Sequence, residues 1–241
     1  MQAPIFSATD EQKLMATLWA SQVKDDPLTF VRMAFPWGKA GTPLEHHQGP
    51  RKWQREVLTE LAAHIRQNNG KVDFDTFRMA VSSGRGIGKS ALVSWLVIWM
   101  LSTRIGSTTI VSANSETQLR SITWAEITKW LALALNSHWF EISATRVTPA
   151  RWLADLVERD LKKGTRYWGV EGRLWSEENP DAYAGVHNFD GVFLVFDEAS
   201  GISDAIWQVA QGFFTENTPH RFWMAFSNPR RNTGYFYECF N

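Results

Sequence analysis

The chain has 241 residues, of which 44% are hydrophobic and 21% are charged, so its composition is that of a folded globular protein and excludes a disordered chain. Its 25 basic and 25 acidic residues leave no net charge, so no overall positive field attracts nucleic acid or an anionic membrane. Any contact with nucleic acid must therefore be local, or be supplied by another chain or domain.

The cysteine content and the apolar stretches place further limits on the class of protein. The single cysteine, Cys239, excludes a disulfide within the chain and suits a reducing, intracellular compartment. The first residues lack the basic and apolar regions of a secretion signal. The longest apolar stretch, residues 91–101, is too short to span a bilayer, so we expect a buried helix there. The 13 tryptophans lie mostly in apolar runs, and we expect them mainly in the core.

In chain order, the first part of the sequence is predicted to be helical. Apolar spacing indicates helices over residues 13–23, over 28–35 after Pro27, and over 53–65 after Pro50. Residues 36–49, rich in Gly, Pro and His, predict a surface loop, and Asn-Asn-Gly at 68–70 predicts a turn. We therefore expect a helical N-terminal subdomain over residues 1–70 and a second unit over 71–241.

From residue 77 the pattern changes to strands that alternate with helices. Short apolar or β-branched runs predict strands at residues 77–82, 108–113, 191–196 and 221–227, and helices are expected at 91–101, 116–135 and 204–214. Residues 140–188, of mixed charge, predict short strands and loops. This alternation indicates an α/β fold with a mostly parallel sheet covered by helices on both faces.

A glycine-rich segment, Ser-Gly-Arg-Gly-Ile-Gly-Lys-Ser, joins the first predicted strand to the apolar helix, which is the context that a phosphate-binding loop requires. Gly86 and Gly88 permit positive φ, so backbone N–H groups can approach phosphate oxygens. Lys89 is expected to reach the β- and γ-phosphates, and the Ser90 hydroxyl to ligate Mg²⁺. We therefore predict that the protein binds and hydrolyses ATP.

The residues of this segment that we expect to contact nucleotide are Gly84, Gly86, Ile87, Gly88, Lys89, Ser90 and Ala91. The helix that follows adds the positive end of its dipole. The strict motif has glycine at position 83, where this chain has Ser83. The alternative interpretation is an incidental glycine turn.

Carboxylates and small polar residues follow two later strands. Five apolar residues at 192–196 precede Asp197, expected in the Mg²⁺ shell, and Glu198, expected to polarise the attacking water as general base. Ser227 and Asn228 follow another apolar strand, where they are expected to sense the γ-phosphate. The alternative for this pair is a turn, because Asn-Pro is a turn dipeptide.

The sequence Trp53-Gln54 opens the third predicted helix. A glutamine amide can hydrogen-bond to both the donor and the acceptor edge of adenine. The alternative interpretation is a glutamine on the surface.

Taken in this order, these elements resemble the ATPase part of the large terminase subunit, the motor that packages DNA in tailed phages and related viruses. The resemblance implies a P-loop NTPase fold of the ASCE type and runs from about residue 49 to 237. It rests on segments 49–56, 83–90, 112–118, 184–187, 195–200 and 227–229, the fourth of which reads Ala-Gly-Val-His.

The resemblance also implies roles for individual residues. Gln54, beside Trp53, matches the family's adenine-contacting glutamine, so the N-terminal subdomain is expected to contribute to the adenine pocket. Arg85 matches an arginine that stabilises charge on the γ-phosphate, and we expect it to act in catalysis with Lys89 and Glu198. The alternative for Arg85 is a solvated loop charge. Ser227 and Asn228 match the motif that couples hydrolysis to movement. A neighbouring subunit is expected to supply one further arginine, for which the candidates are Arg120, Arg146 and Arg151.

The function implied is ATP-driven translocation of double-stranded viral DNA into a procapsid, with ATP and Mg²⁺ as cofactors. The expected partners are the portal protein and the small terminase subunit, in a ring-shaped homo-oligomer whose subunits are monomers in isolation. The expected location is the host-cell cytoplasm, at the procapsid portal, and not the mature virion. The family's C-terminal nuclease domain is expected to be absent from these 241 residues. Two alternatives remain, a helicase-like translocase and a nucleotide-gated assembly module that binds ATP without turning it over.

Overall fold

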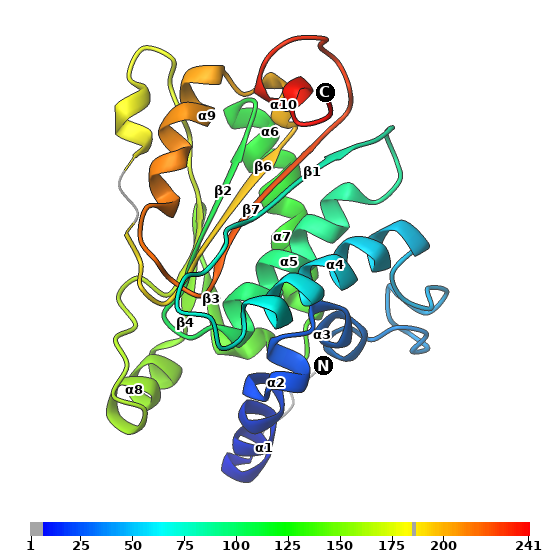
Figure 1. The fold of residues 1–241 in the computed structure, drawn as a ribbon. Coiled ribbons are helices and arrows are strands. Elements are labelled where there is room, and N and C mark those ends of the chain that lie inside the picture. Colours follow the sequence, from blue (N-terminus) through cyan, green and yellow to red (C-terminus); the bar gives the residue numbers. More distant parts are fainter. Residues whose placement is uncertain (1–6, 185–186) are drawn as a thin grey trace.

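The computed structural model describes residues 7–184 and 187–241 (Figure 1). Within these residues a seven-stranded sheet has the order β1-β7-β6-β2-β5-β4-β3. The strands are β1 (Phe77–Ser82), β2 (Thr108–Ala113), β3 (Phe140–Ile142), β4 (Arg146–Pro149), β5 (Gly169–Gly172), β6 (Val192–Asp197) and β7 (Arg221–Ser227). The pairs β1–β7, β7–β6, β6–β2 and β2–β5 are parallel, and the pairs β5–β4 and β4–β3 are antiparallel. The predicted α/β fold with a mostly parallel sheet is confirmed.

The central strands bury side chains on both faces, which explains why their sequences are apolar without interruption. On β6, Phe193 and Val195 enter a core that the N-terminal helices share, whereas Leu194 and Phe196 enter a second core on the opposite face. Helix α9 (Asp204–Ala210) covers this second face, and a short 3₁₀ turn (Gln211–Phe214) follows it (Figure 1). The sheet is therefore the middle of three layers.

Helix α5 (Lys89–Thr103) packs between the sheet and the outer helices, and every residue from Leu92 to Thr103 is buried. Its apolar side chains point in all directions, as expected for a helix enclosed on every side. The buried hydroxyls of Ser94 and Thr103 donate to carbonyls one turn earlier in the same helix. The predicted buried helix is confirmed and is two residues longer at each end.

Four N-terminal helices pack on one side of this layer: α1 (Ala8–Trp19), α2 (Ser21–Lys24), α3 (Pro27–Ala34) and α4 (Lys52–Asn68). The prediction of one helix over residues 13–23 is wrong, because Ala20 adopts an extended conformation (φ −68°, ψ 144°) that separates α1 from α2. The predicted helix start at Pro27 is confirmed, and the Asp26 side chain caps it. The division at residue 70 remains a prediction.

The predicted helix over residues 116–135 is interrupted. It consists of α6 (Glu116–Gln118), a π-helical segment (Leu119–Trp124) and α7 (Ala125–Leu133). The interruption lies near the predicted site, where π-helical turns often occur.

Residues 140–184 contain the short strands that the sequence predicts, together with helix α8 (Arg151–Asp160), which it did not predict. This helix buries Leu153 and Val157, which lie on its apolar face with Trp152 and Leu156. The remaining short helices are Ser137–Trp139, Pro180–Tyr183, Ala199–Gly201 and α10 (Tyr235–Glu238). Of the segment 184–187 used in the resemblance, Gly185 and Val186 lie outside the described residues.

The core contains most of the tryptophans, as predicted: eight of the 13 are buried, namely Trp95, Trp99, Trp124, Trp130, Trp139, Trp168, Trp207 and Trp223. Across residues 7–184 and 187–241, none of the helices has both the length and the apolar content needed to cross a membrane.

Candidate nucleotide-binding site

Three of the predicted segments meet at one edge of the sheet, where the parallel strands β1, β6 and β7 end. Ser82 of β1 is paired with Ser227 of β7, and Asp197 of β6 is paired with Phe226. The backbone N–H of Ser83 donates to the Ser227 carbonyl at 3.1 Å. The phosphate loop, the Asp-Glu pair and the Ser-Asn pair are therefore neighbours, and ligands of open parallel sheets bind at this edge.

The loop between β1 and α5 depends on two left-handed glycines. Gly86 has φ 72° and Gly88 has φ 93°, a region that other residues rarely adopt. A Cβ atom on Gly88 would also lie only 2.9 Å from Nε2 of Gln54, whereas one on Gly84 would meet nothing within 4 Å. Glycine is thus required at position 88 both by the backbone and by its neighbour.

The buried side chain of Lys89 closes the loop on itself. Its Nζ donates to the Gly84 carbonyl at 2.8 Å, to the Ser83 carbonyl at 3.2 Å and to Oδ1 of Asn228 at 2.7 Å. Burial lowers the pKa of this amine, and the nearby carboxylates of Glu198 and Asp197 oppose that effect. The ammonium group therefore lies among the predicted site residues, held by neutral oxygens.

Asp197 is buried at the end of β6. Its Oδ2 accepts a 2.6 Å hydrogen bond from the hydroxyl of Thr123, and its Oδ1 accepts one from the backbone N–H of Glu198 at 3.1 Å. Burial raises the pKa of the Asp197 carboxyl, and the bond from Thr123 acts in the opposite direction. Thr123 lies in the π-helical segment and is a site residue that the sequence reasoning missed.

Glu198 has a left-handed backbone (φ 50°, ψ 42°), uncommon for a residue other than glycine and typical of functional sites. Its side chain is 17% exposed, and within the described residues its Oε2 is a buried atom without a hydrogen bond. Nη2 of Arg230 lies 3.8 Å from this oxygen. Arg230 follows the Ser-Asn-Pro segment, and the sequence reasoning did not select it.

Ser227 is buried at the end of β7 and binds the turn that follows Glu198. Its Oγ lies 2.8 Å from the hydroxyl of Ser200 and accepts from the backbone N–H of Ser200 at 3.2 Å. A shift at the end of β7 would therefore reach this turn directly.

The start of α4 is attached to the phosphate loop by three side chains. Gln54 Nε2 donates to the Gly88 carbonyl at 2.8 Å, Trp53 Nε1 to that of Ile87 at 3.3 Å, and Arg51 Nη1 to that of Gly86 at 3.5 Å. Gln54 is buried, and its Oε1 also accepts from the Arg51 backbone N–H at 2.8 Å. One amide N–H and one lone pair of Gln54 remain for another partner.

Two adjoining cavities lie beside this loop. One, of about 370 Å³, is lined by Arg85, Gly86, Gly88, Lys89, Ser90, Ala91, Glu126, Glu198 and Asn228. The other, of about 240 Å³, is bounded by Trp37, Trp95 and Trp130 together with Gln54. Gly88 and Ala91 line both cavities, so a polar compartment and a mainly apolar one, which we call the aromatic compartment after its tryptophans, share this part of their walls. Arg85 is exposed at the rim of the polar compartment.

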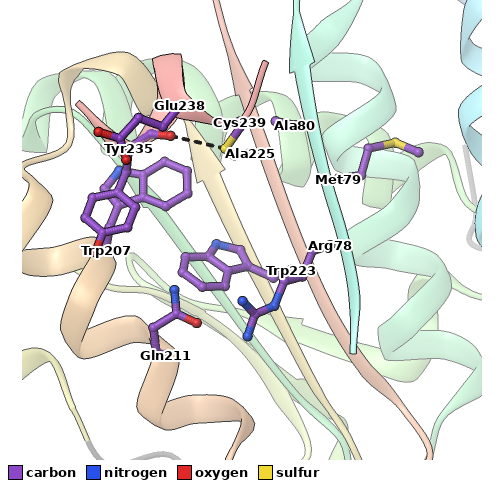
Figure 2. Close-up of a pocket in the computed structure, with 10 residues that line it drawn as sticks. All are labelled: Arg78, Met79, Ala80, Trp207, Gln211, Trp223, Ala225, Tyr235, Glu238 and Cys239. Carbon is purple, nitrogen blue, oxygen red and sulfur yellow. Dashed lines mark hydrogen bonds between the residues drawn. The ribbon is translucent and has the colours of Figure 1, made fainter. Parts of the chain in front are cut away.

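A larger cavity of about 450 Å³ lies on the α9 side of the sheet (Figure 2). Its walls include Trp207 stacked on Tyr235 and Arg78 placed over Trp223. It contains none of the residues predicted from the motifs. The candidate nucleotide site is therefore the smaller cavity beside the phosphate loop, which contains the motif residues.

The three arginines considered for a neighbouring subunit lie on different elements of the chain, and all are exposed. Arg120 forms an ion pair with Glu116, Arg146 lies on β4, and Arg151 opens α8 near Asp155.

No protein-family model matches the chain. Over 164 residues it is 31% identical to a probable terminase large subunit of Enterobacteria phage P7. That alignment covers 66% of this chain and 30% of the relative, so the chain matches less than a third of the relative's length.

Two solved structures have a similar fold. The HK97 bacteriophage large terminase has a TM-score of 0.51 at 15% identity, covering 85% of this chain and 37% of that one. The ATPase domain of the Thermus phage P74-26 large terminase, in a mutant form, has a TM-score of 0.52 at 19% identity, and the match covers 79% of this chain and 69% of that one. At such low identity the likeness establishes the fold.

Proposed function

We propose that this chain, an ATPase domain of the large terminase type, hydrolyses ATP to drive double-stranded viral DNA into a procapsid. The observation that supports this most directly is the convergence of Lys89, from the start of α5, with Asp197, Glu198 and Asn228, from the ends of β6 and β7, around the phosphate loop. These groups supply the cation, the carboxylates and the polar sensor that phosphoryl transfer to water requires.

In this proposal Glu198 is the general base. Its buried Oε2, which has no hydrogen bond within the described chain, is able to accept a proton from a water molecule. Lys89 would exchange its contacts with Asn228 and the loop carbonyls for phosphate oxygens. Arg85, exposed at the rim of the same cavity, would stabilise charge on the γ-phosphate.

The residues present suit Mg²⁺ that arrives with the nucleotide. The Ser90 hydroxyl and the Asp197 carboxylate offer hard oxygen ligands, and Mg²⁺ is usually held by one or two carboxylates together with phosphates and water. Among the described residues no cluster of three or more His, Cys, Asp or Glu side chains could hold a metal by itself. When bound, Mg²⁺ would neutralise charge that develops on the phosphates.

The aromatic compartment is the proposed site of the adenine base. Its tryptophans offer flat apolar surfaces, and it shares Gly88 and Ala91 of its wall with the phosphate compartment. Gln54 lines it and retains one donor and one acceptor for the base. Trp53 does not line this compartment, and it would support the phosphate loop through its hydrogen bond to the Ile87 carbonyl.

The whole motor is proposed to act as a ring in the host cytoplasm, at the portal of the procapsid, with the small terminase subunit as a further partner. One arginine of a neighbouring subunit, from the set Arg120, Arg146 and Arg151, would complete the site. Contacts with DNA should be mostly to phosphates, because a translocase must accept any sequence.

The experiment consists of three measurements on the wild-type chain: binding of a nonhydrolysable ATP analogue, phosphate release in the presence of portal and duplex DNA, and unwinding of a tailed duplex. Binding with phosphate release and without unwinding of a tailed duplex would support the proposal. Unwinding would favour the helicase-like alternative. Tight binding without phosphate release, even with portal and DNA, would favour the assembly module. Failure to bind the analogue would exclude all three.

A further inference from the structure

We propose that Arg230 is a restraining residue that holds the Glu198 carboxylate in an inactive arrangement until nucleotide binds. This inference rests on the proposed function, because it concerns the same carboxylate. It adds a control element that neither the motifs nor the relatives assign.

The geometry places one cation beside one functional oxygen. Nη2 of Arg230 lies 3.8 Å from Oε2 of Glu198, which is too long for a hydrogen bond but close enough for strong attraction between charges. The carboxylate is mostly buried, with 17% of its side chain exposed, whereas the arginine side chain is 47% exposed. The arginine can therefore move away into solvent, but the carboxylate has little freedom.

A general base must form a hydrogen bond to the attacking water and must take up its proton. A guanidinium 3.8 Å from the same oxygen attracts it and so competes with the attacking water for it. Arg230 thus opposes the reaction for as long as it stays at Glu198.

The loop that carries Arg230 also contacts the Lys89 ammonium group. Asn228, two residues before Arg230, accepts the 2.7 Å hydrogen bond from Lys89. Pro229 between them has a restricted φ, which reduces the freedom of Arg230 to move independently of Asn228. When phosphate oxygens draw Lys89 away from Asn228, the loop of residues 228–230 is released, and Glu198 is released with it.

The contact belongs to the nucleotide-free arrangement, so its removal should favour the nucleotide-bound one. We expect Arg230→Ala to lower the Kd for a nonhydrolysable ATP analogue with Mg²⁺ by roughly two- to fivefold, the size of a partly exposed ion pair. Its kcat for phosphate release should equal or exceed that of the wild type. Arg230→Lys should give a smaller change in Kd.

Two matched variants separate this effect from a general loss of charge. Arg231→Ala removes a cation from the next residue, which lines a different cavity, so its Kd should stay the same or rise. In a Glu198→Gln background the carboxylate charge is absent, so adding Arg230→Ala should leave the Kd unchanged.

An unchanged or higher Kd in Arg230→Ala would overturn the inference, as would a fall in kcat or an equal gain in affinity in the Glu198→Gln background. In each of those cases the wild type still binds nucleotide, and the proposed function stands. A wild type that does not bind the analogue would overturn the proposed function and this inference together.

Discussion

Nζ of Lys89 lies 2.7 Å from Oδ1 of Asn228, and this contact joins the first residue of α5 to the residue that follows β7. With the two loop carbonyls, it gives the buried ammonium group three acceptors. A buried lysine without such partners would be costly. In the proposed function, nucleotide phosphates would have to replace these hydrogen bonds, so binding would be coupled to rearrangement of the β7 end.

The first prediction separates binding from chemistry. Lys89→Ala removes the cation expected at the phosphates and should weaken binding of an ATP analogue roughly 10- to 100-fold, the worth of a charge-assisted contact. Glu198→Gln should bind the analogue normally and lose roughly 10²- to 10⁴-fold in phosphate release, the contribution of a general base. Calorimetry and single-turnover phosphate release measure the two effects. Lys13→Ala, on an exposed part of α1, is the control. Wild-type behaviour of both site variants would refute the assignment.

The second prediction concerns Gly88. Alanine there combines an unfavourable φ of 93° with a Cβ 2.9 Å from Gln54 Nε2, so the Gln54 side chain must shift and its hydrogen bond to the Gly88 carbonyl is disturbed. We expect Gly88→Ala to lower the free energy of unfolding by about 1–3 kcal/mol, measured by chemical denaturation. Gly84→Ala, in the same loop but with open space around its Cβ, should change it by less than about 1 kcal/mol. Equal effects of the two substitutions would show that the Gln54 contact has no part in the loss.

The third prediction tests Thr123 as the residue that orients Asp197. Thr123→Val keeps the shape of the side chain and removes the 2.6 Å hydrogen bond to the carboxylate. Loss of such a partner of a metal ligand typically costs 10- to 100-fold in metal affinity, so the Mg²⁺ concentration for half-maximal phosphate release should rise by roughly tenfold or more. Thr128→Val, whose hydroxyl bonds only to a backbone carbonyl on an exposed face, is the matched control. An unaltered Mg²⁺ requirement in Thr123→Val would remove Thr123 from the site.

The sequence predicted those parts of the molecule whose signal is local. The resemblance to large terminase subunits is confirmed by the phage relative and by the fold. The buried strand before Asp197 was recognisable because a central parallel strand is apolar on both faces. Gly88 and Lys89 were recognisable because a phosphate loop requires these residue types at fixed spacing.

The contacts that the sequence did not predict depend on long-range packing. Thr123 reaches Asp197, 74 positions away, from a π-helical segment that interrupts an otherwise regular helical pattern. Arg230 reaches Glu198 only because β6 and β7 are neighbours in the sheet. These two contacts arise from tertiary structure, which local pattern does not encode. Helix α8 is a different case, because Trp152, Leu153, Leu156 and Val157 recur at helical spacing and this local signal was present in the sequence.

The fourth prediction concerns His220, which directly precedes β7 and whose Nδ1 is buried without a hydrogen bond in the described part of the chain. Burial lowers the pKa of this imidazole to about 2 from its usual 6.5, and the positive charges of Arg104, Lys24 and Lys163 add to the effect. The folded protein thus keeps His220 neutral, whereas the unfolded chain binds a proton below about pH 6.5. Stability must therefore fall as the pH is lowered from 6.5 toward 2.

From this group alone, the free energy of unfolding should decrease by up to about 2 kcal/mol between pH 7.5 and pH 5, because the proton binds only to the unfolded chain. His220→Gln removes the titrating ring, so denaturation curves at the two pH values should differ less for this variant than for the wild type. His46→Gln, in the exposed loop before α4, is the control and should keep the full wild-type difference. If the pH dependence of His220→Gln matched that of the wild type, another group would have to account for it. The comparison of variants is decisive because carboxylates that also titrate in this range contribute equally to all three proteins.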